Sequence, residues 1–170
     1  MGSQEPTAAV RDAFDAVVAT ADFPMWIVTA AADGDKAGCL VGFTAQASIE
    51  PPRFLVGLSK TNYTFGVAAR ADHLAVHLIS RRNVALARLF GGESGVEVDK
   101  FTHCQWRYGP FGVPVLAAAA GWFVGEVVHR TDFGDHVGTL LAPVAASAPA
   151  SPRTALRYHA VAHISPGHPA

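Results

Sequence analysis

Residues 38–64 read GCLVGFTAQASIEPPRFLVGLSKTNYT, and this stretch decides the fold. It opens as an apolar run of small residues and turns polar over residues 44–48. Glu50-Pro51-Pro52 then interrupts the chain, because proline fixes φ and donates no backbone hydrogen bond. Residues 54–58 form a second short apolar run, which is typical of a buried strand. The stretch therefore predicts two strands separated by a tight turn.

Hydrogen-bonding side chains follow the second of these strands. Ser59-Lys60-Thr61-Asn62-Tyr63-Thr64 opens a predicted short helix over residues 62–70. The first N–H groups of a helix have no backbone partners, and the helix dipole favours negative charge there. Lys60 and its neighbours therefore suit an anion. The spacing leaves one alternative open, in which Thr61 or Asn62 only caps the helix and Lys60 is solvated.

Four motifs in this order resemble the flavin reductase-like family of FMN-binding split β-barrels. They are a Gly/Ser/Thr-rich strand, an acidic-Pro-Pro turn, an apolar strand and a basic-x-Asn-x-Thr segment, here at residues 40–48, 50–52, 54–58 and 60–64. A later Gly134-Asp135-His136 matches the Gly-Asp-His of many NAD(P)H-using members. The likeness covers roughly residues 10–165. One departure is Gly42-Phe43, which stands where many members carry Asn-Ser or Ser-Ser.

The resemblance implies a single domain over residues 1–170 with a mainly β fold. The expected architecture is an antiparallel split β-barrel of Greek-key type with two or three short peripheral helices. The implied activity is that of an NAD(P)H-dependent flavin reductase, which passes hydride from NADH or NADPH to bound FMN, with FAD as the other candidate flavin. A more specific form of this expectation is the reductase component of a two-component flavin monooxygenase.

Two other functions stay open at this point. One is an FMN-binding flavoprotein or flavin carrier that does not use NAD(P)H. The other, weaker one is a haem-handling split barrel, which would need an axial ligand such as His159 or His163.

The resemblance also assigns roles to individual side chains. His136 is the expected catalytic residue, and Asp135, His136 and Phe101 are expected to bind the nicotinamide substrate. Phe101 ends an Asp99-Lys100-Phe101 that resembles a family Asp-Lys-Phe near the active site. The expected flavin-binding residues are Leu40, Val41, Gly42, Phe43, Thr44, Ala45, Gln46, Ser48, Ser59, Lys60, Asn62 and Thr64.

The composition bounds the kind of protein. A chain of 170 residues can bury a substantial core as one domain. Half of its residues are hydrophobic and only 16% are charged, which leaves apolar surface for a partner, so we expect a homodimer. A net charge of −1 with scattered basic residues argues against nucleic-acid binding. The chain shows neither an 18-residue apolar run nor a signal-peptide profile, so no membrane association and a cytoplasmic location are expected.

The cysteines and histidines show no recognisable ligand pattern. Cys39 and Cys104 have neither a zinc spacing nor a disulfide framework. His73 and His77 share one face of a predicted strand, but no third ligand accompanies them, so no metal is expected.

Hydrophobic spacing predicts the remaining elements. Residues 6–19 have a 3.6-residue period, which is typical of a helix that packs against the core. A turn at residues 33–36 predicts a hairpin between strands at 23–31 and 38–48. Gly38 and Gly42 within the second strand indicate either a flat ring lying on it or a bend of the barrel.

The second half of the chain alternates in the same way. Further strands are predicted at 73–79, 113–129, 137–145 and 155–164, with a helix at 84–90 capped by Asn83 and a loop at 91–110. Trp106, Tyr108 and Phe111 in and after that loop suit either a cover for a flat cofactor or a dimer contact. The ends, residues 1–5 and 166–170, are expected to be disordered. About seven strands in hairpin-like order indicate an antiparallel barrel.

Overall fold

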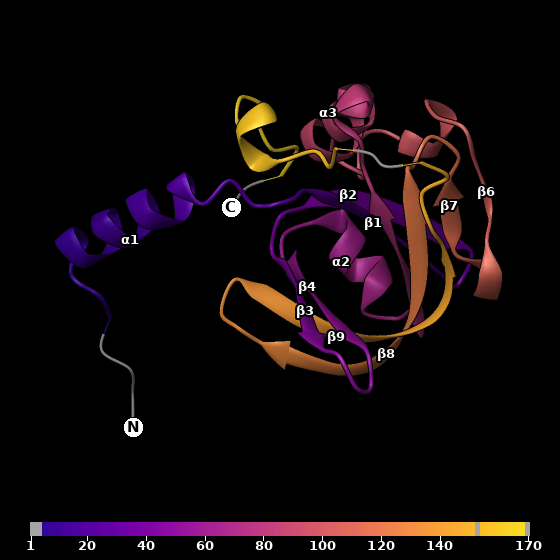
Figure 1. Ribbon diagram of the computed structural model, residues 1–170, viewed down its shortest axis with the longest axis horizontal. Coiled ribbons are helices and arrows are strands. Elements are labelled where there is room, and N and C mark those ends of the chain that lie inside the picture. The colour runs from indigo at the N-terminus through magenta and orange to yellow at the C-terminus, as the bar shows by residue number, and fades with distance from the viewer. Residues whose placement is uncertain (1–4, 152–153, 169–170) are drawn as a thin grey trace.

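The computed structural model describes residues 5–151 and 154–168 (Figure 1). Its first hairpin forms at the predicted turn, with Asp33 and Gly34 between the two strands. β1 (Trp26–Ala32) and β2 (Asp35–Val41) pair antiparallel along their whole length. Asp33 and Gly34 have positive φ values of 53° and 85°, as a two-residue hairpin turn of type I′ requires. The predicted hairpin is confirmed.

Within the described residues, seven strands form one antiparallel sheet in the order β2-β1-β5-β8-β9-β4-β3. The other members are β3 (Thr44–Ser48), β4 (Arg53–Ser59), β5 (His73–Leu78), β8 (Gly121–Asp132) and β9 (His136–Ser147). The two outermost strands, β2 and β3, are separated by only two residues of chain, so the sheet must curl until its ends meet (Figure 1). These ends do not pair with each other. The mainly β, antiparallel split-barrel prediction is confirmed.

The corner between β2 and β3 corrects one prediction. Residues 38–48 were expected to form one strand, but Gly42-Phe43 breaks it because β2 pairs with β1 and β3 pairs with β4. A Cβ atom on Gly42 would lie 2.5 Å from the Phe23 ring, and one on Gly38 would lie 2.7 Å from the Phe90 ring. Because neither glycine has a side chain, each leaves room for a phenylalanine ring of the protein itself. Gly42 also lies at the bend of the barrel.

Two short helices lie where they were predicted, but only one is capped as expected. α2 (Tyr63–Ala68) begins after Asn62, whose Oδ1 accepts a hydrogen bond of 2.9 Å from Thr64 N. α3 (Val84–Gly92) begins after Asn83, whose side chain makes no cap because it donates to the Ala118 carbonyl instead. The prediction that Asn83 caps this helix is wrong, because its side chain bonds to a carbonyl that is distant in the chain.

α1 (Ala8–Thr20) confirms the predicted first helix but not its packing. It extends away from the barrel (Figure 1). Val10, Phe14 and Val17 on its apolar face are 58%, 63% and 72% exposed. A 3.6-residue period identifies an apolar face but not the segment that covers it. Within one chain, none of the described residues covers this face of α1. No helix in residues 5–151 and 154–168 is long and apolar enough to cross a membrane.

The predicted loop at 91–110 and the strand after it are arranged differently from the expectation. β6 (Trp106–Tyr108) pairs with β7 (Pro114–Leu116) as a separate two-stranded sheet. The strand expected over 113–129 is therefore two strands, because residues 117–120 turn the chain before β8. Phe111 lies between β6 and β7 and stacks on His73, with ring centroids 4.1 Å apart.

The predicted closing strand at 155–164 is wrong. That segment makes only isolated bridges, Pro24 with Arg157 and Ser80 with Ala155, and then forms a 3-10 turn at Tyr158–Ala160. Leu156 is fully buried, and its backbone hydrogen-bonds to the backbone of both Ile79 and Met25. This apolar residue therefore fills a gap between the ends of β5 and β1 and is not part of a strand. His159 Nε2 lies 2.7 Å from the Ala19 carbonyl oxygen.

Of the two predicted tails, residue 5 and residues 166–168 are described. Residues 1–4 and 169–170 lie outside the described residues. Gly167 N donates to the Gly91 carbonyl at 3.1 Å, and His168 reaches the helix start at Thr61. The last described residues therefore lie against α3 and the start of α2.

Candidate functional site

A cavity of about 140 Å³ lies where the end of β2, the end of β4 and the start of β9 meet. It is lined by the predicted site residues Leu40, Val41, Gly42, Phe43, Ser59, Asn62 and His136, together with Cys39, Gly57, Leu58 and His168. The corner at Gly42-Phe43 brings these residues together, because it joins the two ends of the curled sheet. Segments that are almost a hundred residues apart in the chain thus share one cavity.

Other predicted flavin residues lie elsewhere. Thr44, Ala45 and Gln46 line a separate hollow of about 430 Å³ beside Trp26 and Phe54. Ser48 is not among the residues that line either hollow. The break at Gly42-Phe43 explains the division, since β3 continues along β4 and leaves the cavity behind.

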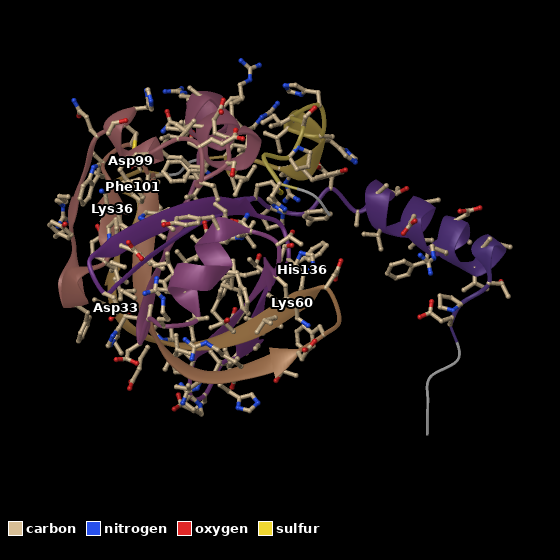
Figure 2. All side chains as sticks on the ribbon, turned by 180° about the vertical axis from the view of Figure 1, so that it is seen from behind. Asp33, Lys36, Lys60, Asp99, Phe101 and His136 are labelled. Carbon is tan, nitrogen blue, oxygen red and sulfur yellow. The ribbon has the colours of Figure 1, made fainter. Side chains whose placement is uncertain are left out.

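Phe101 is not brought to His136 within one chain. It is 4% exposed and lines another cavity, of about 320 Å³, with Lys36 and Asp99. Figure 2 shows Lys36, Asp99 and Phe101 together, well apart from His136 and Lys60 in that view. The neighbouring Lys100 is buried and donates to the carbonyls of Gly38 and Phe90 at 3.1 and 3.0 Å. Asp99-Lys100-Phe101 therefore ties its loop to β2 and α3.

Lys60 is held by an acidic partner that the sequence motifs did not reveal. Its Nζ lies 2.7 and 2.9 Å from the two carboxylate oxygens of Asp132, at the end of β8. This ammonium group, together with a hydrogen bond from Gly134 N, holds the pKa of Asp132 below its usual range. The Lys60 side chain remains 38% exposed. The cation expected to meet a phosphate is thus available at the surface, but it is already paired.

Hydroxyl groups accompany Lys60 at the start of α2. Ser59 Oγ lies 2.9 Å from Thr61 Oγ1, which lies 3.2 Å from Nδ1 of His168. Thr64, by contrast, is 1% exposed, so its side chain belongs to the interior. Asn62 caps the helix, as the alternative reading of the motif predicted. His168 was missed because a single histidine in a Gly/Pro tail carries no spacing signal.

His136 is oriented by the residue before it. Its Nδ1 lies 2.8 Å from Asp135 Oδ1, and the hydrogen bond holds the pKa of Asp135 below its usual range. Since an ionised carboxylate can only accept, the hydrogen must be on Nδ1, which leaves Nε2 with the lone pair in the neutral ring. The side chain is 24% exposed, and its ring lies 4.8 Å from the Phe43 ring. The imidazole is therefore fixed but accessible.

The buried thiol that lines part of the cavity is poorly suited to act as a nucleophile. Cys39 is 3% exposed, and burial raises the pKa of its thiol to about 11. The nucleophilic form of cysteine is the thiolate, which this pKa suppresses at neutral pH. The cavity thus presents the Ser59 hydroxyl and the His136 ring beside residues 40–43, whereas Lys60 and Thr61, the neighbours of Ser59 in the chain, do not line it.

Comparisons with known proteins show what the chain is similar to. The family model described as "Flavin reductase like domain" matches residues 19–163. The stachydrine N-demethylase reductase subunit Stc3 of Rhizobium meliloti is 32% identical over 133 residues, which cover 76% of this chain and 54% of that protein. The chain thus spans about half of that relative's length. The FMN reductase (NADH) RutF of Ancylobacter novellus is 29% identical over 170 residues, covering 95% of this chain and 91% of that protein.

A solved structure shares the fold over most of the chain. It is a flavin reductase domain protein from Arthrobacter sp. FB24, with a TM-score of 0.80 and 25% sequence identity. The superposition covers 88% of this chain and 91% of that one.

Proposed function

The chain belongs to the flavin reductase-like domain family, and we propose that it is an NAD(P)H-dependent reductase of FMN. One observation carries this proposal: His136, oriented by Asp135, borders the same cavity as the Gly42-Phe43 corner and Ser59. The residue that we assign to the nicotinamide and the segments that we assign to the flavin thus border one cavity. The RutF relative, by its name, supports FMN and NADH as the pair.

The residues at this corner fit FMN by their chemistry. One end offers the Lys60 ammonium and the hydroxyls of Ser59 and Thr61, which suit a phosphate. The other end is the segment 40–43, where the exposed Phe43 suits contact with a ring system. When bound, FMN supplies the acceptor for hydride. Thr44, Ala45, Gln46 and Ser48 lie outside the cavity, so contact with them requires a ligand that extends along β3.

Each group has a separate task in this proposal. Lys60 exchanges its Asp132 carboxylate for the phosphate of the flavin, and residues 40–43 border the ring. His136, held through Nδ1, positions the nicotinamide. We assign no proton transfer to it, because hydride transfer depends on the distance and alignment of the donor and acceptor atoms.

The proposal is tested by mixing purified protein with NADH, and separately with NADPH, in the presence and absence of FMN. We expect FMN-dependent loss of the nicotinamide absorbance, and a larger rate with one of the two nucleotides. A flavin that binds but does not promote any loss with either nucleotide would instead indicate the flavin carrier.

We also propose a homodimer and an oxygenase partner. The exposed apolar face of α1 and the small volume of the cavity support a second copy that completes the flavin site. The name of the Rhizobium relative, a reductase subunit of a demethylase, supports transfer of reduced flavin to a partner enzyme.

A further inference from the structure

Two glycines face each other across β4 and β9. Gly57 and Gly138 are register partners in this antiparallel pair. Residues directly opposite each other in such a pair project on the same side of the sheet. Their missing side chains therefore leave one bare strip of backbone on that side.

Two phenylalanine rings occupy this strip. A Cβ atom on Gly57 would lie 3.0 Å from Cβ of Phe43, and a Cβ atom on Gly138 would overlap the Phe133 ring. Neither ring is buried by the contact, since Phe43 is 57% and Phe133 58% exposed. Each ring is thus seated on a glycine with one surface left for another group.

His136 lies on the same side of the sheet as the two rings. It is two residues from Gly138, and side chains two apart along a strand share a face. Its ring is 4.8 Å from Phe43, and its carbonyl accepts a 2.9 Å hydrogen bond from Phe133 N. This bond closes the turn at Gly134, whose φ is +120°. The hairpin therefore fixes Phe133 and His136 beside each other.

We propose that Phe43 and Phe133 form a clamp that stacks on a flat heteroaromatic ring at His136, and that Phe133 is a positioning residue for that ring. The isoalloxazine of a flavin and the nicotinamide of a nucleotide are both flat heteroaromatic rings. The choice of these two candidates rests on the proposed reductase function. Aromatic rings favour offset or edge-on contact with such ligands. Packing in the core does not account for these two rings, because both remain more than half exposed.

The test compares Phe133→Leu and Phe43→Leu with Phe111→Leu as a matched control. Phe111 is 62% exposed and also stacks on a histidine, His73, but it lies in the turn between β6 and β7. FMN affinity is measured by quenching of flavin fluorescence, and nicotinamide affinity by equilibrium titration with NAD⁺ and NADP⁺, neither of which needs turnover. Thermal melts check that each variant folds.

We expect Phe133→Leu to weaken one of the two ligands about 3- to 10-fold, with Phe133→Tyr restoring it and Phe111→Leu leaving both unchanged. The ligand that weakens identifies the source of the ring. Unchanged affinity for both ligands in folded Phe133→Leu overturns the clamp, as does an equal loss in Phe111→Leu. If Phe133→Leu weakens a ligand but the wild-type protein transfers no hydride, the clamp is retained and the reductase is overturned.

Discussion

His136 shows how a single residue can be prepared for positioning. Its Nδ1–H is committed to Asp135, so the ring cannot rotate freely, and Phe43 lies against it. This arrangement is suited to aligning a substrate, because small errors in the approach of reacting atoms have a large effect on rate.

We therefore expect His136→Ala to leave FMN affinity nearly unchanged, to raise the KM for the reduced nicotinamide and to slow flavin reduction about 10-fold or more. Stopped-flow reduction of the FMN-loaded variant measures this. Asp135→Asn should give a smaller effect of the same kind, because it keeps the ring but weakens its anchor. Wild-type rates in both variants would remove His136 from the site.

Lys60 gives the second prediction at this scale. Lys60→Ala should weaken FMN by about 10- to 100-fold, since a charge-assisted hydrogen bond contributes roughly 1.5–3 kcal/mol. It should scarcely affect riboflavin, which lacks the phosphate. Asp132→Asn should have the opposite sign and tighten FMN, because it removes the carboxylate that competes for the ammonium. Equal losses for FMN and riboflavin would contradict a phosphate role.

Individual contacts were the least predictable level from sequence. The motifs identified the cavity wall at residues 40–43, as well as Ser59, Asn62 and His136. They could not reveal that Asp132, 72 residues from Lys60, would pair with it. Phe133 was missed for the same reason, since its role appears only when β9 brings Gly138 opposite Gly57. Such pairs depend on strand register, which no local spacing encodes.

At the scale of elements, a buried histidine joins three strands. His77 of β5 is fully buried, with Nδ1 3.0 Å from the Ile27 carbonyl of β1, and Nε2 accepts from Leu116 N of β7 at 3.2 Å. The Ile27 carbonyl requires the hydrogen on Nδ1, and the Leu116 amide requires the lone pair on Nε2. Burial lowers the pKa of His77 to about 4.

The sign of the resulting pH dependence follows from this pKa. The unfolded chain binds a proton at His77 near pH 6.5, whereas the folded protein stays neutral there until about pH 4. The contribution is fully present above pH 6.5 and decreases as the pH falls towards 4, by about 3 kcal/mol in all. Urea unfolding at several pH values should show a steeper loss for wild type than for His77→Gln. The control is His73→Gln, and equal slopes for wild type and His77→Gln would contradict the account.

Elements with a turn signal were predicted well, whereas alternation alone gave a mixed result, since it located β5 but misassigned residues 155–164. The Asp33-Gly34 turn fixed the β1–β2 hairpin in advance, because few residues adopt its φ values. Residues 155–164 alternate like a strand, yet Leu156 fills a gap between strand ends. The break at Gly42-Phe43 was hidden because both halves are strands, and only the whole barrel shows that they join different neighbours.

At the scale of the molecule, the exposed apolar surface leads to a prediction of assembly. α1 leaves Val10, Phe14 and Val17 in solvent, and a helix of 13 residues is marginal in water without tertiary packing. We expect light scattering to give twice the chain mass of 17.8 kDa, with or without FMN. A stable monomer with full FMN affinity would show that one chain provides the whole flavin site.

The central claim is that this barrel passes hydride from a nicotinamide to FMN, and anaerobic mixing tests it most directly. FMN-loaded protein is mixed in a stopped-flow instrument with NADH and, separately, with NADPH, and the flavin absorbance is followed. The account predicts rapid bleaching with at least one nucleotide, and slower bleaching in His136→Ala at the same FMN occupancy. Flavin that stays oxidised with both nucleotides would contradict the reductase and leave a flavin-binding protein.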